Sequence, residues 1–244
     1  ARLTLGSVTG LKVISSLDEL TNLDGFDAVI NLAGEPIVDK RWTDRQKAVI
    51  QASRWDTTRK LVALFNASSI PPTVFLSGSA IGFYGEHGTE QIDETTQVSK
   101  SDFSSELCQQ WEQIAGEVAQ TTRLVYLRTG IVLHPQFGAL QRMILPFKLG
   151  LGGPIADGQH YFSWIHWQDM VAAMHFLLTN EQVSGPVNMT APGPVTNKTF
   201  TTALGKAVHR PTIFCMPGFV LKTLMGESAE LLLASQRVIP KVLV

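Results

Sequence analysis

The chain has 244 residues, with 20 basic and 21 acidic side chains, a formal net charge of −1 and no long run of one charge. Nucleic acids and membrane surfaces select clusters of basic residues, so this balance argues against both as partners. The two cysteines, Cys108 and Cys215, lack metal-binding spacing, and no apolar run approaches the roughly 20 residues of a membrane span. We therefore expect a reduced, cytoplasmic α/β protein without a metal.

The first half of the chain predicts alternating strands and helices. We expect short strands, each an apolar and β-branched run, at residues 8–14, 28–32, 73–76 and 124–127. We expect helices at residues 18–22, 43–52, 56–67 and 103–118. Thr43 and Gln46 have capping-box spacing and open the second of these helices. The alternation predicts a Rossmann-like, doubly wound parallel sheet that binds its ligand at the carboxyl ends of the strands.

From about Pro135 the pattern changes to shorter elements. A helix in QRMILPFKLG, a GLGGP loop and a YFSWI strand precede a helix over residues 167–178. A further helix capped near Thr196 or Asn197 and a Pro-bounded helix around residues 218–225 follow. We interpret residues 1–134 as the nucleotide-side domain and residues 135–244 as a small substrate-side lobe. We expect residues 165–180 to pack back on the first domain.

Several motifs resemble one enzyme superfamily. NLAGEPI, SGSAIGFYG, LRTGIVL and FSWIHWQDM occur in this order, as in the extended, sugar-nucleotide-epimerase form of the short-chain dehydrogenases/reductases. With SRW and LGLGGPI, the set is most similar to an atypical branch whose members are called epimerase family proteins, and it covers essentially the whole chain. The resemblance implies a Rossmann-like fold, NADP(H) binding with NAD(H) as the alternative, and a lobe that closes over a small substrate.

The amino terminus departs from this pattern. A dinucleotide-binding domain begins with a strand, a glycine-rich turn and a helix whose N-terminus receives the pyrophosphate. Here GSVTG is the first glycine pair, and LKVI after it resembles the third strand of the superfamily. A strand without its neighbours would expose an unpaired edge. We therefore expect that one βαβ unit, at least ~30 residues, is missing before it.

A second departure concerns the expected helix at residues 103–118. The superfamily places a catalytic tyrosine and a lysine four residues apart on one face of this helix, and the lysine lowers the pKa of the tyrosine. Phe103 and Leu107 stand at these positions. Phenylalanine has no proton to give and leucine has no charge, so the usual catalytic pair is absent.

The candidate cofactor-binding residues follow three expected strands and one helix. Small residues there either close a tight turn or let the backbone approach a dinucleotide. The candidates are Asn31, Leu32, Ala33, Gly34, Glu35, Arg54, Ser77, Gly78, Thr129, Gly130, Ile131 and Val132. Glu35 either contacts a ribose or stays solvated, and Arg54 in the SRW motif either binds a phosphate or is an ordinary surface arginine. The resemblance implies that residues 129–132 line the nicotinamide.

The candidate catalytic residues are Ser79 and Tyr84. The resemblance implies that Ser79 hydrogen-bonds a substrate oxygen. Tyr84 is either a core or substrate-lining residue or a replacement acid, and its ordinary pKa of about 10 would then need to be lowered. For His166 and Asp169 we favour helix capping over catalysis.

The sequence thus predicts an NADP(H)-binding, epimerase-like protein. Its expected reaction is hydride-linked reduction or epimerisation of a small polar or nucleotide-linked substrate. The absent tyrosine and lysine keep a second interpretation open, a non-catalytic NADP(H) sensor or regulator, with a role in cell division as one form of it. We expect a small-molecule substrate as the partner, and a homodimer is an alternative to a monomer.

Overall fold

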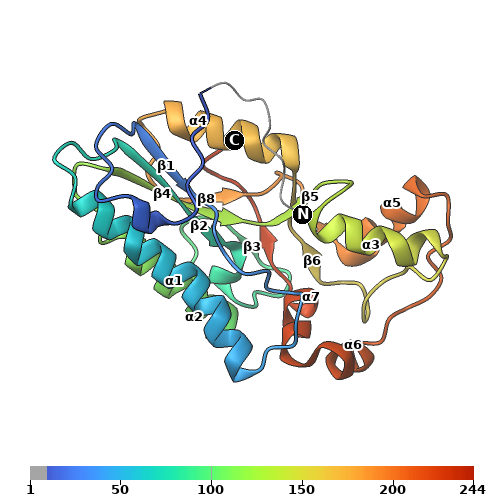
Figure 1. The fold of residues 1–244 in the computed structure, drawn as a ribbon. Helices are drawn as coiled ribbons and strands as arrows, with labels where there is room; N and C mark the ends of the chain where they lie inside the picture. Colours follow the sequence, from blue (N-terminus) through green and yellow to red (C-terminus); the bar gives the residue numbers. More distant parts are fainter. Residues whose placement is uncertain (1–9, 100) are drawn as a thin grey trace.

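The computed structural model describes residues 10–99 and 101–244 (Figure 1). Its centre is a four-stranded parallel sheet in the order β1-β2-β4-β8. The strands are β1 (Ala28–Asn31), β2 (Val74–Ala80), β4 (Arg123–Thr129) and β8 (Gly185–Met189). The predicted parallel sheet is therefore confirmed.

The register of the sheet brings the candidate loops to one edge. Asn31 lies opposite Ser77, and Ser77 lies opposite Tyr126 on the next strand. All these strands run in parallel, so the segments that follow them leave the sheet at the same, carboxyl edge. This is where a Rossmann-like sheet binds ligands.

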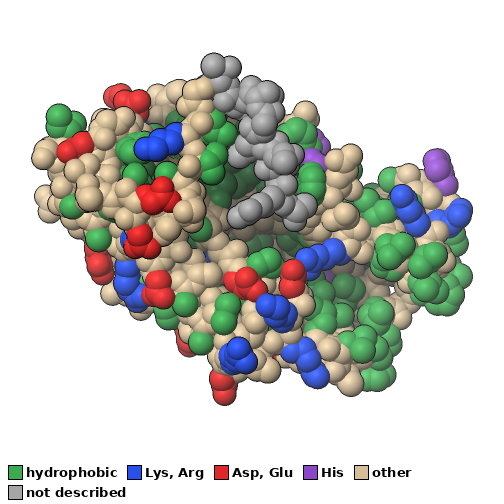
Figure 2. Space-filling model, in the orientation of Figure 1, with side chains coloured by type: hydrophobic (Ala, Val, Ile, Leu, Met, Phe, Trp, Pro, Cys, Tyr) green, Lys and Arg blue, Asp and Glu red, His purple; other side chains and the backbone are tan. Residues whose placement is uncertain are grey.

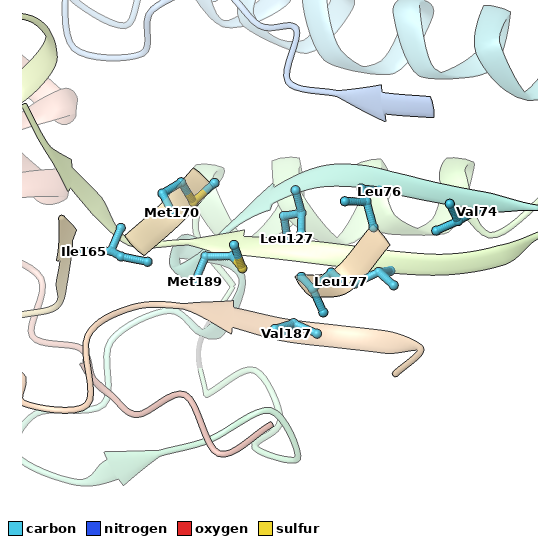
Figure 3. Close-up of a cluster of buried hydrophobic side chains, with 9 residues drawn as sticks. Val74, Leu76, Leu127, Ile165, Met170, Leu177, Val187 and Met189 are labelled. Atoms are coloured by element: carbon cyan, nitrogen blue, oxygen red, sulfur yellow. The ribbon is translucent and has the colours of Figure 1, made fainter. Parts of the chain in front are cut away.

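Helices cover both faces of the sheet. Figure 1 shows α1 (Asp44–Asn66) and α2 (Phe103–Ala115) on one face and α4 (Trp167–Thr179) on the other. Side chains alternate along β2, because successive residues of a strand point to opposite faces. Val74 and Leu76 pack with Leu177 of α4 (Figure 3), whereas Phe75 packs with Phe65 of α1. Two apolar cores thus hold the sheet between its helices.

Four expected elements of the first half differ in the structure. The helices expected at residues 43–52 and 56–67 form one helix, α1, because the hydroxyl of Ser53 bonds to the carbonyl of Ile50 (2.8 Å) and does not break the turn. Residues 10–14 form no strand, so the prediction of a strand at residues 8–14 is wrong over this part. Residues 8 and 9 lie outside the described part. The expected helix at 18–22 is a 3-10 turn, η1 (Leu17–Glu19).

The remaining elements between residues 131 and 233, outside the sheet and α4, are short, and we call them the lobe. Its helices are α3 (Gly138–Lys148), α5 (Asn197–Ala207), α6 (Gly218–Met225) and α7 (Glu230–Leu233), with the 3-10 turn η3 (Gly226–Ala229) before α7. Its strand pairs are β5 (Ile131–Leu133) with β7 (Trp164–His166) and β6 (Tyr161–Phe162) with β9 (Val195–Thr196). Thr196 caps α5, which confirms one of the two expected caps.

Two further contacts shape the lobe. The expected YFSWI strand splits at Ser163, whose hydroxyl donates to the carbonyl of Gln236 (2.6 Å) and accepts from the N–H of Val238 (3.0 Å). The strand β10 (Arg237–Val238) pairs with β3 (Gln91–Ile92), so the carboxyl-terminal segment is tied to the first half beside the 3-10 turn η2 (Ile81–Tyr84). Across residues 10–99 and 101–244, no helix combines the length and apolar character that crossing a membrane requires.

Candidate functional site

A cavity of about 550 Å³ opens where the carboxyl edge of the sheet meets the lobe. Its wall is formed by the end of β2, by α2, by the segment after β4, and by α3, β6 and α7 of the lobe. We call it the lobe cavity. Five of the predicted site residues line it: Arg54, Ser79, Thr129, Gly130 and Ile131.

The other predicted site residues lie elsewhere. A second cavity of about 580 Å³ runs along β1 and is lined by Asn31, Leu32 and Ala33. Neither cavity is lined by the remaining candidates, which are Gly34, Glu35, Ser77, Gly78, Tyr84 and Val132. Asn31, Leu32 and Ala33 thus lie on a different cavity from Ser79, although Ile37 and Val38, later in the loop after β1, line the lobe cavity.

A hydrogen-bond network fixes the loop after β1. The side-chain amide of Asn31 donates to Thr58 Oγ1 (3.0 Å), and its oxygen accepts the N–H of Ala33 (3.1 Å). Trp111 Nε1 also donates to Thr58 Oγ1 (2.8 Å). Because Thr58 lies on α1 and Trp111 on α2, these bonds hold the loop against both helices.

Two glycines of the candidate loops are explained by close packing. A Cβ atom on Gly78 would lie 2.8 Å from the ring of Trp111 and 2.9 Å from the carbonyl oxygen of Asn31. A Cβ atom on Gly34 would lie 2.8 Å from the guanidinium carbon of Arg54. At Gly78 the Trp111 ring and the Asn31 backbone leave no room for a larger residue, whereas at Gly34 the close atoms are the end of the flexible Arg54 side chain, which can move.

Arg54 is a half-buried cation on the wall of the lobe cavity. Its Nη1 atom donates to the carbonyls of Glu35 (3.1 Å) and Ile50 (3.3 Å), and the guanidinium lies 5.4 Å from the Trp111 ring centroid. Burial lowers the pKa of Arg54. Within the described residues no carboxylate forms an ion pair with Arg54, since Glu35 pairs with Lys40 (3.1 Å). Among the described residues Arg54 thus has no ion-pair partner, although the charge of Glu35 acts on it from a longer distance.

Ser79 connects the lobe cavity to a buried ion pair. Its hydroxyl donates to Glu112 Oε1 (2.7 Å), and Arg128 binds the same carboxylate through Nε (2.9 Å) and Nη2 (2.8 Å). All three side chains are buried. The carboxylate of Glu112 thus accepts hydrogen bonds both from the Ser79 hydroxyl and from the bidentate guanidinium of Arg128. Ser79, which lines the lobe cavity, therefore has its hydroxyl proton engaged by Glu112 and its oxygen lone pairs left as acceptors.

Tyr84 lies behind this network. It is fully buried, its hydroxyl donates to Asn188 Oδ1 (2.7 Å), and it accepts from Arg128 Nη1 (3.1 Å). Burial raises the pKa of Tyr84 above its ordinary value. The structure thus places Tyr84 as a brace for Arg128 rather than on the wall of the cavity.

The helix α2 presents apolar side chains where catalytic relatives carry a tyrosine and a lysine. Phe103 packs edge-on against Trp42, with ring centroids 4.8 Å apart. Leu107 is 2% exposed, packs with Ile50 and also lines the lobe cavity. Burial raises the pKa of the neighbouring Cys108 to about 12, so its thiol stays protonated at neutral pH.

The sequence reasoning missed Glu112 and Arg128. Both are charged residues next to apolar ones: Glu112 follows Trp111 on the predicted amphipathic helix, and Arg128 lies at the end of a buried strand. Charged residues are buried almost only when they are paired, so two such residues are a signal for a buried ion pair. Nothing in the sequence indicates that Ser79 completes it.

His166 caps α4 by accepting a hydrogen bond from the N–H of Gln168 (3.4 Å). This agrees with the expectation that His166 caps a helix rather than taking part in catalysis.

Two family models match the chain. The one described as "NAD dependent epimerase/dehydratase family" matches residues 8–189. A second, described as a domain of unknown function (DUF1731), matches residues 216–244 and thus includes α6, α7 and β10.

Several known proteins are similar along most of the chain. "Epimerase family protein SDR39U1 homolog, chloroplastic" of Arabidopsis thaliana is 40% identical over 231 residues, which are 93% of this chain and 66% of that protein. "Epimerase family protein SDR39U1" of Mus musculus is 37% identical over 88% of this chain and 74% of its own length. The crystal structure of human SDR39U1 (isoform 2) with NADPH superposes with a TM-score of 0.88 at 35% identity, covering 92% of this chain and 78% of that one. The chain thus spans about two thirds of the plant relative's length.

Proposed function

The chain belongs to the NAD dependent epimerase/dehydratase family, and on that premise we propose that it binds NADP(H) and catalyses hydride-linked reduction or epimerisation of a small molecule in the lobe cavity. The cavity opens at the carboxyl edge of a parallel sheet, where this kind of fold binds its ligands. A fold does not define a reaction, so the proposal depends on the groups that line the cavity.

The described residues fit a dinucleotide phosphate. Arg54 is a half-buried cation without a carboxylate partner in the described structure, and burying an unpaired charge is costly. A phosphate oxygen would supply the missing counter-charge through charge-assisted hydrogen bonds. NADPH in the human relative supports this cofactor over NADH. When bound, the cofactor supplies or removes the hydride, and the protein orients the substrate and moves the proton.

The observation that carries the proposed activity is the Ser79–Glu112 pair. Ser79 lines the cavity, and its hydroxyl donates its proton to Glu112 Oε1 at 2.7 Å, so its oxygen can still accept a hydrogen bond. A substrate hydroxyl can therefore donate to Ser79. As the substrate carbon loses its hydride, the substrate proton passes to Ser79 Oγ and the proton of Ser79 passes to Glu112. Reduction runs this relay backward and returns a proton to the substrate oxygen.

Arg128 gives the relay its geometry. Its two bonds to Glu112 fix the carboxylate, and its third, to Tyr84, fixes the guanidinium. Ser79 and Glu112 thereby take the place of the tyrosine and lysine of the wider superfamily, which Phe103 and Leu107 replace on α2.

A second candidate function is NADP(H) sensing without turnover. The observation that favours it is the apolar packing of Phe103 and Leu107, since neither can hold a proton. Under this alternative, Ser79 and Glu112 only hold the end of β2 against α2.

NADPH binding and NADPH consumption, measured separately, distinguish the two functions. We expect wild-type protein to bind NADPH and to consume it with at least one carbonyl compound of a varied panel. Ser79→Ala should retain NADPH affinity within about twofold and lose turnover by roughly 100-fold or more, the usual size of an acid–base effect.

The matched control is Ser101→Ala. Ser101 also donates to a glutamate, Glu106 Oε1, at 2.7 Å, but the pair lies on the surface outside the lobe cavity. This variant should keep both binding and turnover. NADPH binding without consumption by any compound would favour the sensor, and equal turnover in Ser79→Ala would refute the relay.

A further inference from the structure

The charged groups on the wall of the lobe cavity are few. Among the described residues that line it, the cations are Arg54 and Arg142 and the anions are Asp102 and Glu230. Arg142 forms an ion pair with Asp39. Asp102 caps α2 by accepting the N–H of Ser105 (2.8 Å). The ion pair with Asp39 thus neutralises the charge of Arg142, and the carboxylate of Asp102 is engaged in capping α2.

Arg54 is the remaining cation, and the proposed function assigns it to the cofactor. A nucleotide-linked sugar carries a pyrophosphate of its own, and proteins bind such groups with arginine or lysine side chains. A second dinucleotide-like ligand in this cavity would need a second unpaired cation. The described wall does not offer one.

The rest of the wall is mainly apolar. Large apolar side chains reach it from both the sheet domain and the lobe: Leu107, Trp111, Met143, Phe162, Leu231 and Leu232. Leu107 replaces the charged residue that catalytic relatives place on this helix face. Contact with these side chains favours a ligand with apolar surface, because burying that surface away from water lowers the free energy.

Besides the carboxylate of Glu230, the polar groups that remain include neutral hydrogen-bonding groups. Ser79 offers lone pairs, because its own proton is held by Glu112. His160 lines the cavity on the lobe side, and its Nε2 atom is buried without a hydrogen-bond partner in the described structure. Burial lowers the pKa of His160, so its imidazole is neutral at pH 7. Neutral groups of this kind pair with a hydroxyl or a carbonyl rather than with a phosphate.

We propose that the substrate of the lobe cavity is an uncharged, mainly apolar alcohol or ketone, and that nucleotide-linked sugars are excluded. The inference rests on the proposed function only in assigning Arg54 to the cofactor. Ser79 accepts a hydrogen bond from the hydroxyl group of the alcohol. The apolar wall contacts the hydrocarbon part of the alcohol or ketone.

Binding of N-phenyl-1-naphthylamine tests the proposal. This probe is uncharged and apolar, has one N–H donor, and fluoresces in apolar surroundings. We expect saturable 1:1 binding to the protein saturated with NADP⁺, which does not fluoresce, and no displacement by millimolar UDP-glucose. Displacement of the probe by UDP-glucose, or the absence of saturable probe binding, would overturn the proposal.

Two positions on α3 locate the bound probe. Met143 lines the lobe cavity, whereas Leu145 is 63% exposed and lies outside it. Figure 2 shows hydrophobic side chains gathered on the surface of the lobe, so a surface control is needed. Met143→Glu should weaken probe binding at least tenfold, and Leu145→Glu should leave it unchanged. Ala139→Glu, one turn earlier on the same wall, replaces Met143→Glu if that variant does not fold.

The reverse pattern, with loss in Leu145→Glu and retention in Met143→Glu, would place the probe on the lobe surface and overturn the proposal. NADP⁺ affinity is measured for each variant and should not change. If NADP⁺ does not bind the wild-type protein, the proposed function fails. The probe and UDP-glucose are then compared on the cofactor-free protein, so the two failures are distinguishable.

Discussion

Replacing Arg128 by methionine removes the counter-ion of a buried carboxylate. Arg128 is 5% exposed and Glu112 is 7% exposed, and two hydrogen bonds join them. Methionine fills much of the same space but leaves Glu112 with Ser79 as its remaining partner in the network. Breaking a buried pair on one side costs about 3–5 kcal/mol, because the other charge stays buried. For a chain of this length the midpoint of thermal unfolding should fall by about 6–20 °C.

Urea unfolding of the protein without cofactor measures this free energy. Arg59→Met is the matched control, because Arg59 pairs with Asp56 (2.7 Å) on the exposed face of α1, and it should change stability by less than about 1 kcal/mol. The double variant Glu112→Leu/Arg128→Met should lose less than the sum of the two single variants, since it leaves no unpaired charge. A loss under about 1 kcal/mol in Arg128→Met, with additive single variants, would refute the buried-pair reasoning.

Three further outcomes are expected. Gly78→Ala should lower the free energy of unfolding by about 1–3 kcal/mol, because the added Cβ would lie 2.8 Å from the Trp111 ring. The control Gly193→Ala should leave it unchanged, because no atom lies within 4 Å of that Cβ. Equal effects of the two changes in urea unfolding would refute the packing argument. Leu107→Lys should cost roughly 3 kcal/mol, because it buries an ammonium in a site that is 2% exposed, and an unchanged melting midpoint would show that the position is wet. The Thr95 hydroxyl and then Lys241 hold the pKa of Asp93 at about 2, below its ordinary 3.8, so this carboxylate stabilises the fold above about pH 4 and ceases to do so toward pH 2. Asp93→Asn should therefore be less stable at pH 7 and lose less stability than the wild type between pH 4 and pH 2, and parallel pH–stability curves would contradict this.

Local patterns in the sequence were sufficient for three of the four strands of the sheet and for most of its helices, but they did not predict β8. The apolar runs at residues 28–32, 73–76 and 124–127 end in small residues, and they became adjacent parallel strands with a common carboxyl edge. The Pro-bounded helix at 218–225 also formed as expected, because a helix boundary is set by residues within one turn of it. The division of residues 43–67 into two helices was wrong, since Ser53 can satisfy its hydroxyl inside a helix as well as end one.

The site was decided by the tertiary structure. Ser79, Glu112 and Arg128 come from β2, α2 and β4, and no spacing in the chain predicts that their side chains meet. Gly78 is small because Trp111 and the Asn31 backbone pack against it, and a sequence pattern cannot distinguish this from space for a ligand. The sequence by itself determined which faces are apolar and where strands end, because these depend on near neighbours. Which polar groups share one buried network depends on contacts between distant segments, and only the folded chain sets them.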